Sequence, residues 1–179
     1  MYEWNAVITV SERGYRQAIE LLEEFGSVHR TEFFNVLVMQ ADDIEFLMET
    51  LRERILKNPE IRSFLARLVP LNRTFNFQTP EEFETKAKEL VLVWVPQLAG
   101  KSFHVRMHRR GFKGRLSSPE EERFLDEVLL KSLEKAGTPG MITFDDPDAI
   151  LAVETLGQRA GFSLWTRNDM YQYPFLRLD

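Results

Sequence analysis

The sequence predicts an α+β fold in two parts, and three observations support this prediction. Short runs rich in β-branched and aromatic residues alternate with longer amphipathic runs, which is the pattern of mixed strands and helices. The longer runs begin at recognisable helix-capping residues. Hydrophobic residues make up 44% of the 179-residue chain and include 14 phenylalanines, enough for a buried core. We therefore expect a folded rather than a disordered chain.

The first part, residues 1–78, is expected to follow the order β-α-β-β-α-β. Alternating or fully apolar runs predict its strands. These runs cover residues 4–10, 28–30, 34–40 and 71–78. Such an order is typical of a ferredoxin-like split βαβ unit. We therefore expect an N-terminal ferredoxin-like domain.

The helices of this part are inferred from their capping residues. Ser11 predicts the start of a helix over residues 12–25, and Asp42 predicts the start of a helix over residues 43–57. A short third helix is expected after Asn58-Pro59. Its apolar residues are Ile61, Phe64, Leu65 and Leu68.

The second part, residues 79–179, is expected to be an α/β domain. Thr79-Pro80 predicts the start of one helix, and Ser118 opens a second helix with the same pattern of residues. The tail at residues 170–178 is apolar enough that we expect it to pack back onto the protein. Strands are expected at residues 103–108, 141–144, 150–154 and 162–165.

Composition limits the environment of the protein. The absence of cysteine excludes disulfides and thiolate metal sites, and it is consistent with a reducing compartment. No apolar run approaches the roughly 18 residues of a membrane span, and the N-terminus lacks the plan of a signal peptide. We expect a soluble cytoplasmic protein with no membrane partner.

The strongest departure from the overall composition is residues 101–115, which we call the basic segment. It contains six Lys or Arg, two His and no acidic residue. Without those six, the chain has 17 basic and 28 acidic side chains. Solvated faces normally mix both signs, so an anionic partner is indicated. The charged residues are Lys101, His104, Arg106, His108, Arg109, Arg110, Lys113 and Arg115.

Within the basic segment, apolar and polar residues alternate from Phe103 to His108. This period of two predicts a strand that buries its apolar side chains and exposes its basic ones. The strand is followed by a loop with glycines at 111 and 114, which can adapt to a ligand. Phe112 in this loop could stack on an unpaired base or pack in the core, and the sequence favours neither.

The sequence offers no catalytic or cofactor motif. On a strand, His104 and His108 would lie about 13 Å apart, too far for one metal ion. Residues 145–148, Asp-Asp-Pro-Asp, contain the carboxylates of an acid/base pair, but such residues are more common in a turn. No phosphate-binding glycine loop is present. We therefore expect no cofactor, no metal and no enzymatic activity.

Several of these residues resemble a THUMP domain, an RNA-binding module of tRNA thiouridine synthetases, tRNA methyltransferases and pseudouridine synthases. The similar stretches are Ser102–Gly111, Ser117-Ser118 with Glu121, Phe144–Asp148, Leu151–Glu154 and Gly161–Leu164. The resemblance covers about residues 80–166. In this family a ferredoxin-like domain precedes the THUMP domain, in agreement with the order inferred for residues 1–78.

The resemblance implies binding to the tRNA acceptor stem and 3′ CCA end. It also implies a stand-alone adaptor that presents tRNA to a separate modification enzyme, since the chain has no catalytic motif. The RNA-binding residues carried over are Lys101, His104, Arg106, His108, Arg109, Arg110, Phe112, Lys113 and Arg115. Two alternatives use the same basic face: an adaptor for an acidic protein, and a small-anion sensor.

Overall fold

A computed structural model describes residues 3–179 and has mixed α and β structure with two separate sheets. The chain divides into two compact units. Unit 1 contains the residues up to Leu71 together with Met170–Arg177, and unit 2 contains Asn72–Asp169 together with Leu178–Asp179. Within residues 3–179, no helix is both long enough and apolar enough to cross a lipid bilayer.

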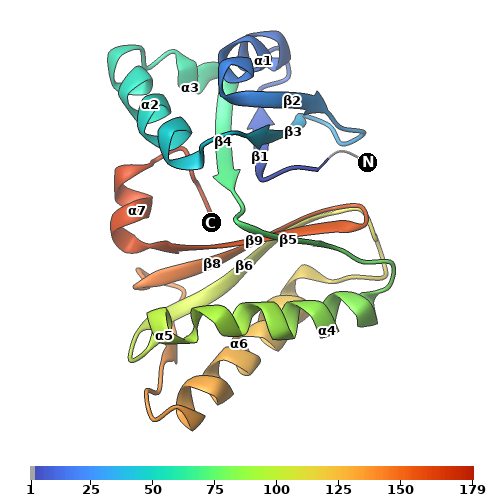
Figure 1. The fold of residues 1–179 in the computed structure, drawn as a ribbon, viewed down its shortest axis with the longest axis vertical. Helices are drawn as coiled ribbons and strands as arrows, with labels where there is room; N and C mark the ends of the chain where they lie inside the picture. The colour runs from blue at the N-terminus through green and yellow to red at the C-terminus, as the bar shows by residue number, and fades with distance from the viewer. Residues whose placement is uncertain (1–2) are drawn as a thin grey trace. The chain divides into compact units, whose positions relative to one another are not determined.

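The sheet of unit 1 has four strands in the order β2-β3-β1-β4, and all its pairings are antiparallel (Figure 1). Strand β1 lies between β3 and β4, and four of its five residues are buried. At its edge, Gly26 of β2 lies opposite Ala41 of β3 with a positive φ of 156°. The strands are β1 (Ala6–Val10), β2 (Gly26–Arg30), β3 (Val36–Ala41) and β4 (Leu65–Pro70).

The helices of unit 1 are α1 (Tyr15–Leu22), η1 (Glu23–Phe25), α2 (Ile44–Lys57) and α3 (Ile61–Phe64). Helix α2 begins one residue later than expected, because Asp43 rather than Asp42 accepts the Phe46 N–H. Ser11 was expected to cap α1, but its carbonyl accepts the Gly14 N–H in a turn. The helix therefore starts one turn later, after Gly14.

The fourth strand of this sheet was assigned to the wrong residues. Leu65 and Leu68 were expected on a helix, yet they lie in β4, which pairs with β1. Residues 71–78 were expected to close the first sheet, but β5 (Arg73–Asn76) pairs with β9 (Arg159–Thr166) in unit 2. The pairing partners decide both assignments, and neither partner is close in sequence.

Unit 2 has a five-stranded sheet in the order β5-β9-β8-β6-β7. Strand β6 runs parallel to both of its neighbours, while β9 runs antiparallel to β8 and to β5. Every residue of β8 is buried, so both faces of the sheet are covered there. The remaining strands are β6 (Ser102–Arg110), β7 (Met141–Ile142) and β8 (Ala149–Leu156).

Helices α4 (Pro80–Val91) and α6 (Ser118–Lys135) lie along one face of this sheet (Figure 1). Thr79 caps α4 as predicted, by accepting the Glu82 N–H. The cap of α6 is Ser117 rather than Ser118. Shorter helices follow α4 and β9: η2 (Leu92–Trp94), α5 (Val95–Leu98) and α7 (Arg167–Gln172).

The core of unit 2 is rich in phenylalanine. Phe75, Phe77, Phe83 and Phe162 come from β5, the following turn, α4 and β9, and their ring centroids lie 5.2–6.2 Å apart. Leu125, Leu129 and Leu133 of α6 complete the layer between helices and sheet. This core fixes β6 against α6, and β6 carries the basic segment.

The C-terminal tail packs back onto the protein, as predicted. In unit 1, Phe175 and Leu176 are buried, and the Phe175 carbonyl accepts the Leu68 N–H from the outer edge of β4. In unit 2, Leu178 is buried as well.

Candidate nucleic-acid interface

Strand β6 holds most of the basic segment on a rigid support. It pairs in parallel with β8 over eight consecutive residues, from Phe103 opposite Ala149 to Arg110 opposite Leu156. Phe103, Val105 and Met107 belong to the core, as the alternation predicted. The basic side chains therefore leave the strand on its other face.

On the edge of β6 that faces away from β8, most backbone groups do not pair with another strand. Side chains accept hydrogen bonds from some of them instead. Strand β7 pairs only with Ser102 and Phe103. Beyond it, Val105 N–H donates to Asp126 Oδ1 at 2.9 Å, and Met107 N–H donates to Glu122 Oε1 at 2.8 Å. Burial raises the pKa of Asp126 to about 7, against the opposing effect of the Val105 hydrogen bond.

His104 does not lie on an exposed surface, which corrects the sequence-based expectation. Its side chain is 0% exposed. The Phe144 ring packs against it at a centroid distance of 5.2 Å, and its Nε2 lies 3.5 Å from Asp179 Oδ1. Both partners are distant in sequence, so the alternation within β6 could not reveal this cover.

Two of the six Lys/Arg side chains are already engaged by carboxylates. Arg106 Nε donates to Asp179 Oδ1 at 2.8 Å. Arg110 donates to Glu154 at 2.7 Å, and Nδ1 of His108 lies 3.8 Å from the same carboxylate. These residues were expected to present free charge, whereas the structure gives each an intramolecular partner.

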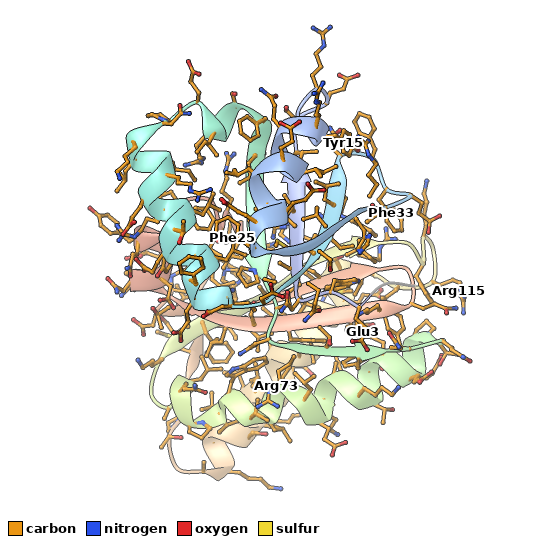
Figure 2. All side chains as sticks on the ribbon, turned by 45° about the horizontal axis from the view of Figure 1, so that its top comes forward. Glu3, Tyr15, Phe25, Phe33, Arg73 and Arg115 are labelled. Carbon is orange, nitrogen blue, oxygen red and sulfur yellow. The ribbon has the colours of Figure 1, made fainter. Side chains whose placement is uncertain are left out.

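The loop after β6 has an unusual backbone. Gly111, Phe112 and Gly114 all have positive φ angles, of 90°, 53° and 77°. The Phe112 ring packs on Phe77 of the core at 5.1 Å, so the core-packing alternative describes this residue. The Arg115 guanidinium lies over the same ring, 4.8 Å from its centroid. Figure 2 shows the labelled Arg115 side chain directed away from the ribbon.

A cleft of about 440 Å³ lies between this loop and the start of α6. Its lining combines two arginines, two serine hydroxyls and one glutamate: Arg109, Arg115, Ser117, Ser118 and Glu120 among its residues. The Arg109 guanidinium donates to the Gly111 carbonyl, which holds it beside the loop. Guanidinium and hydroxyl donors in one cleft are suited to a phosphate oxygen.

The predicted cationic side chains therefore fall into two groups, those with a carboxylate partner and those without one. Within residues 3–179, no carboxylate lies within 4.0 Å of the charged nitrogens of Lys101, Arg109, Lys113 or Arg115. Arg109 and Arg115 line one cleft, with the exposed Lys113 in the same loop. Lys101 is at the other end of β6, about 26 Å away along the strand.

The Asp-Asp-Pro-Asp stretch is a turn, as its more common interpretation predicted. Arg167 Nε donates to Asp146 Oδ1 at 2.8 Å, and its NH1 donates to Asp148 Oδ1 at 3.2 Å. Asp148 Oδ2 also accepts the Ser102 N–H at 2.9 Å, which lowers the pKa of Asp148. The turn is therefore fastened to the start of β6.

Sequence reasoning missed the acidic partners of the basic segment. Glu154 and Asp179 were not considered as partners, although Glu154 lies in a quoted motif. The spacing to their cations, 44 residues for Glu154 to Arg110 and 73 for Asp179 to Arg106, leaves no local signal. Phe144 was quoted for its turn but not for its exposed ring.

Comparison with known proteins finds relatives among tRNA-modifying enzymes. No protein-family model matches the sequence. Two curated proteins named tRNA sulfurtransferase, from Shewanella piezotolerans and Shewanella pealeana, are each 28% identical to the chain over 166 residues. These matches cover 89% of this chain and 32% of each relative, so the chain spans about a third of their length.

Solved structures share the fold at low sequence identity. TrmN from Thermus thermophilus has a TM-score of 0.62 and 19% identity, covering 90% of this chain and 44% of that protein. A 4-thiouridine synthetase in complex with RNA and ATP has a TM-score of 0.55 and 16% identity, covering 92% of this chain and 42% of that protein.

The comparisons correct one prediction. The chain was expected not to be an enzyme because it lacks a catalytic motif, but its curated relatives carry the name of an enzyme. The missing motif was a weak argument, since the chain matches only a third of each relative. Over nearly its whole length, the chain is similar in sequence to part of the tRNA sulfurtransferases.

Proposed function

We propose that this chain is the tRNA-binding part of a tRNA-modifying enzyme and that it contacts the acceptor stem and the 3′ CCA end. The similarity to tRNA sulfurtransferases and the fold shared with a 4-thiouridine synthetase support this proposal. The resemblance of individual motifs in residues 80–166 to a THUMP domain is in agreement with it.

The proposed organisation has two domains. The strand order β2-β3-β1-β4 and the all-antiparallel pairing in unit 1 support a ferredoxin-like domain that ends at about residue 71 and also includes residues 170–177. Helices α4 and α6 on the sheet of unit 2 support a THUMP domain over about residues 72–169.

The observation that carries the proposal is the set of cations at the end of β6. Arg109, Lys113 and Arg115 lack a carboxylate partner among the described residues. Arg109 and Arg115 line a cleft that also offers hydroxyl donors, and Lys113 is exposed in the same loop. Arg106 and Arg110 would have to give up their partners Asp179 and Glu154 to bind phosphate, whereas these three would not. We therefore assign the main phosphate contacts to them, with Lys101 as a separate contact.

The residues with internal partners take a supporting role in this proposal. Arg106, His108 and Arg110 hold the strand and its carboxylates in place, and buried His104 supports Phe144. Phe112 supports the loop from below, while Arg115 lies over its ring.

The test is a charge reversal that leaves the internal ion pairs intact. Arg109→Glu with Arg115→Glu is compared with Arg73→Glu with Arg123→Glu, which makes the same charge change at exposed sites in the same unit. We expect the first pair to weaken tRNA binding at least 30-fold and the control to weaken it less than threefold. Binding is measured with tRNA that has or lacks its CCA end, and circular dichroism verifies the fold.

Equal losses in the two double variants would mean that only net charge matters, and the assigned cleft would be wrong. A protein that binds an acidic protein but no RNA would favour the protein-adaptor alternative. The proposal requires both a preference for the intact CCA end and a loss specific to Arg109 and Arg115.

A further inference from the structure

The loop between β7 and β8 exposes an aromatic ring that the RNA-binding surface described above does not include. The Phe144 side chain is 66% exposed. Next to it in sequence, Thr143 N–H donates to the Phe103 carbonyl of β6 at 3.1 Å. The ring therefore lies beside the first residues of β6.

We infer that Phe144 is a stacking platform for an unpaired nucleotide base of the bound RNA. This inference rests on the proposed function and adds a second contact point to it. Aromatic rings hold single-stranded nucleic acid by stacking on successive bases, and they need one open ring face to do so.

The geometry around Phe144 leaves such a face. The ring packs against His104 at 5.2 Å with an interplanar angle of 44°, and His104 is fully buried. One side of Phe144 is thus supported by the protein while most of its surface stays exposed. A ring fixed from one side loses little conformational freedom when a base stacks on the other.

The loop itself is held in place at several points. Arg167 binds Asp146 and Asp148, and Asp148 exchanges hydrogen bonds with Ser102 through its side chain and its backbone N–H, both at 2.9 Å. These contacts tie the loop to Arg167, directly after β9, and to the start of β6. Phe144 is consequently presented by a fixed turn.

The charges near the ring favour a base over a bare phosphate. Asp145 is exposed, and the carboxylates of Asp146 and Asp148 share a single arginine, so the turn itself repels phosphate. Lys101 lies across the short β7 pairing, where its carbonyl accepts the Met141 N–H at 3.1 Å. Its exposed ammonium can neutralise the phosphate attached to a stacked base.

The distance from Phe144 to the loop after β6 is short enough for one RNA molecule to contact both. His104, under the Phe144 ring, and Arg110, at the start of the loop, are six residues apart on β6, about 20 Å. A stacked strand advances about 3.4 Å per nucleotide, so the two contacts are about six nucleotides apart. If a paired RNA stem binds at the loop after β6, its single-stranded end can extend to Phe144.

The experiment uses the full chain and two RNA hairpins, one blunt and one with a 3′ overhang of about six nucleotides ending in 2-aminopurine. The test variant is Phe144→Leu, which keeps an apolar cover over His104 but removes the ring. Phe34→Leu is the matched control, because Phe34 is another exposed phenylalanine, 74% exposed, in unit 1. Phe144→Trp keeps an aromatic ring.

We expect the parent to bind the overhang hairpin about tenfold more tightly than the blunt one and to quench the 2-aminopurine fluorescence. Phe144→Leu should lose both effects and bind the blunt hairpin unchanged, while Phe34→Leu and Phe144→Trp should keep both effects.

If the parent binds neither hairpin, the proposed function fails and this inference fails with it. If the parent binds both hairpins but Phe144→Leu keeps the preference and the quenching, or the parent shows no preference, only the stacking assignment is wrong.

Discussion

Arg110 donates a hydrogen bond at 2.7 Å to Glu154, whose side chain is fully buried. The two residues are 44 apart in sequence and lie on neighbouring strands β6 and β8. Because a buried carboxylate needs a partner, this arginine belongs to the architecture of the strand pair. Substituting Arg110 would therefore disturb the fold and is a poor test of RNA binding, whereas substituting its neighbour Arg109 is a better one.

Replacing Arg110 by Ala should lower the free energy of unfolding by about 3–5 kcal/mol, because it leaves the Glu154 charge buried without its main partner. Arg109→Ala, one residue earlier, removes a hydrogen bond to the Gly111 carbonyl and should change it by less than about 1 kcal/mol. Urea unfolding of both variants measures the difference. Adding Glu154→Gln to Arg110→Ala should recover part of the loss, and equal stabilities of the two single variants would contradict this account.

The salt dependence of tRNA binding reports how many cations release counterions. Six free Lys/Arg side chains would give a slope of log affinity against log salt of about −4, and the four without carboxylate partners give about −3. We expect the smaller magnitude, and Lys113→Ala should reduce it further by about 0.7. Filter binding between 50 and 300 mM salt tests both values. A slope near −4 in the parent would mean that Arg106 and Arg110 exchange their internal partners for phosphates.

Two buried carboxyl groups predict that the protein becomes less stable as the pH rises. The pKa of Asp126 is raised to about 7 by burial, and that of Glu121 is raised to about 8 by burial and by neighbouring Glu84. Their ordinary values are 3.8 and 4.5, so between pH 5 and pH 9 the folded state binds protons that the unfolded state releases. The unfolding free energy should fall on the order of 2–5 kcal/mol over this range.

Amide variants provide the control for this pH dependence. Asp126→Asn keeps an oxygen to accept the Val105 N–H and removes the titration, and Glu121→Gln does the same at the second site. Each should flatten the curve of urea midpoint against pH and stabilise the protein at pH 8.5. A parent midpoint that is constant from pH 5.5 to 8.5 would show that burial does not shift these groups.

Gly26 allows β2 to approach β3 closely. A Cβ atom at this position would lie 2.0 Å from the Gln40 carbonyl oxygen and 2.9 Å from Ala41 Cα, both backbone atoms that cannot move aside cheaply. Gly26→Ala should destabilise the protein by about 3 kcal/mol. Gly157→Asn is the comparison, because Gly157 has a φ of 56° and open space around it. It should cost about 1 kcal/mol or less in thermal unfolding, and a similar cost for Gly26→Ala would refute the clash.

Helix starts were the most predictable part of the fold, because a cap depends on neighbouring residues. Thr79 caps α4 as the sequence indicates, and the caps of α2 and α6 are each displaced by one residue. Strand membership was less predictable. The apolar residues 61–68 satisfy a helical spacing, but only α3 is helical and β4 is decided by its pairing with β1. Likewise β5 belongs with β9, more than 80 residues away.

The candidate site shows the same division between local and distant causes. The alternation in residues 103–108 correctly predicted a strand with a buried apolar face. It could not predict the state of the other face, because Asp179, Glu154 and Phe144 reach that face from distant segments. The charges in the loop after β6 were easier to assign, since Lys113 and Arg115 are exposed.

The carboxylates of Asp126 and Glu122 on the open side of β6 also affect how copies of this protein behave in a crowded solution. A strand edge with unpaired backbone N–H groups can pair with a strand of another polypeptide and so extend the sheet. Such pairing is a common first step of aggregation. Here two of those donors are already occupied by Asp126 and Glu122 of α6, and a foreign chain would have to displace these side chains to dock. The protein can therefore keep a cationic strand near its surface without assembling into fibrils through it.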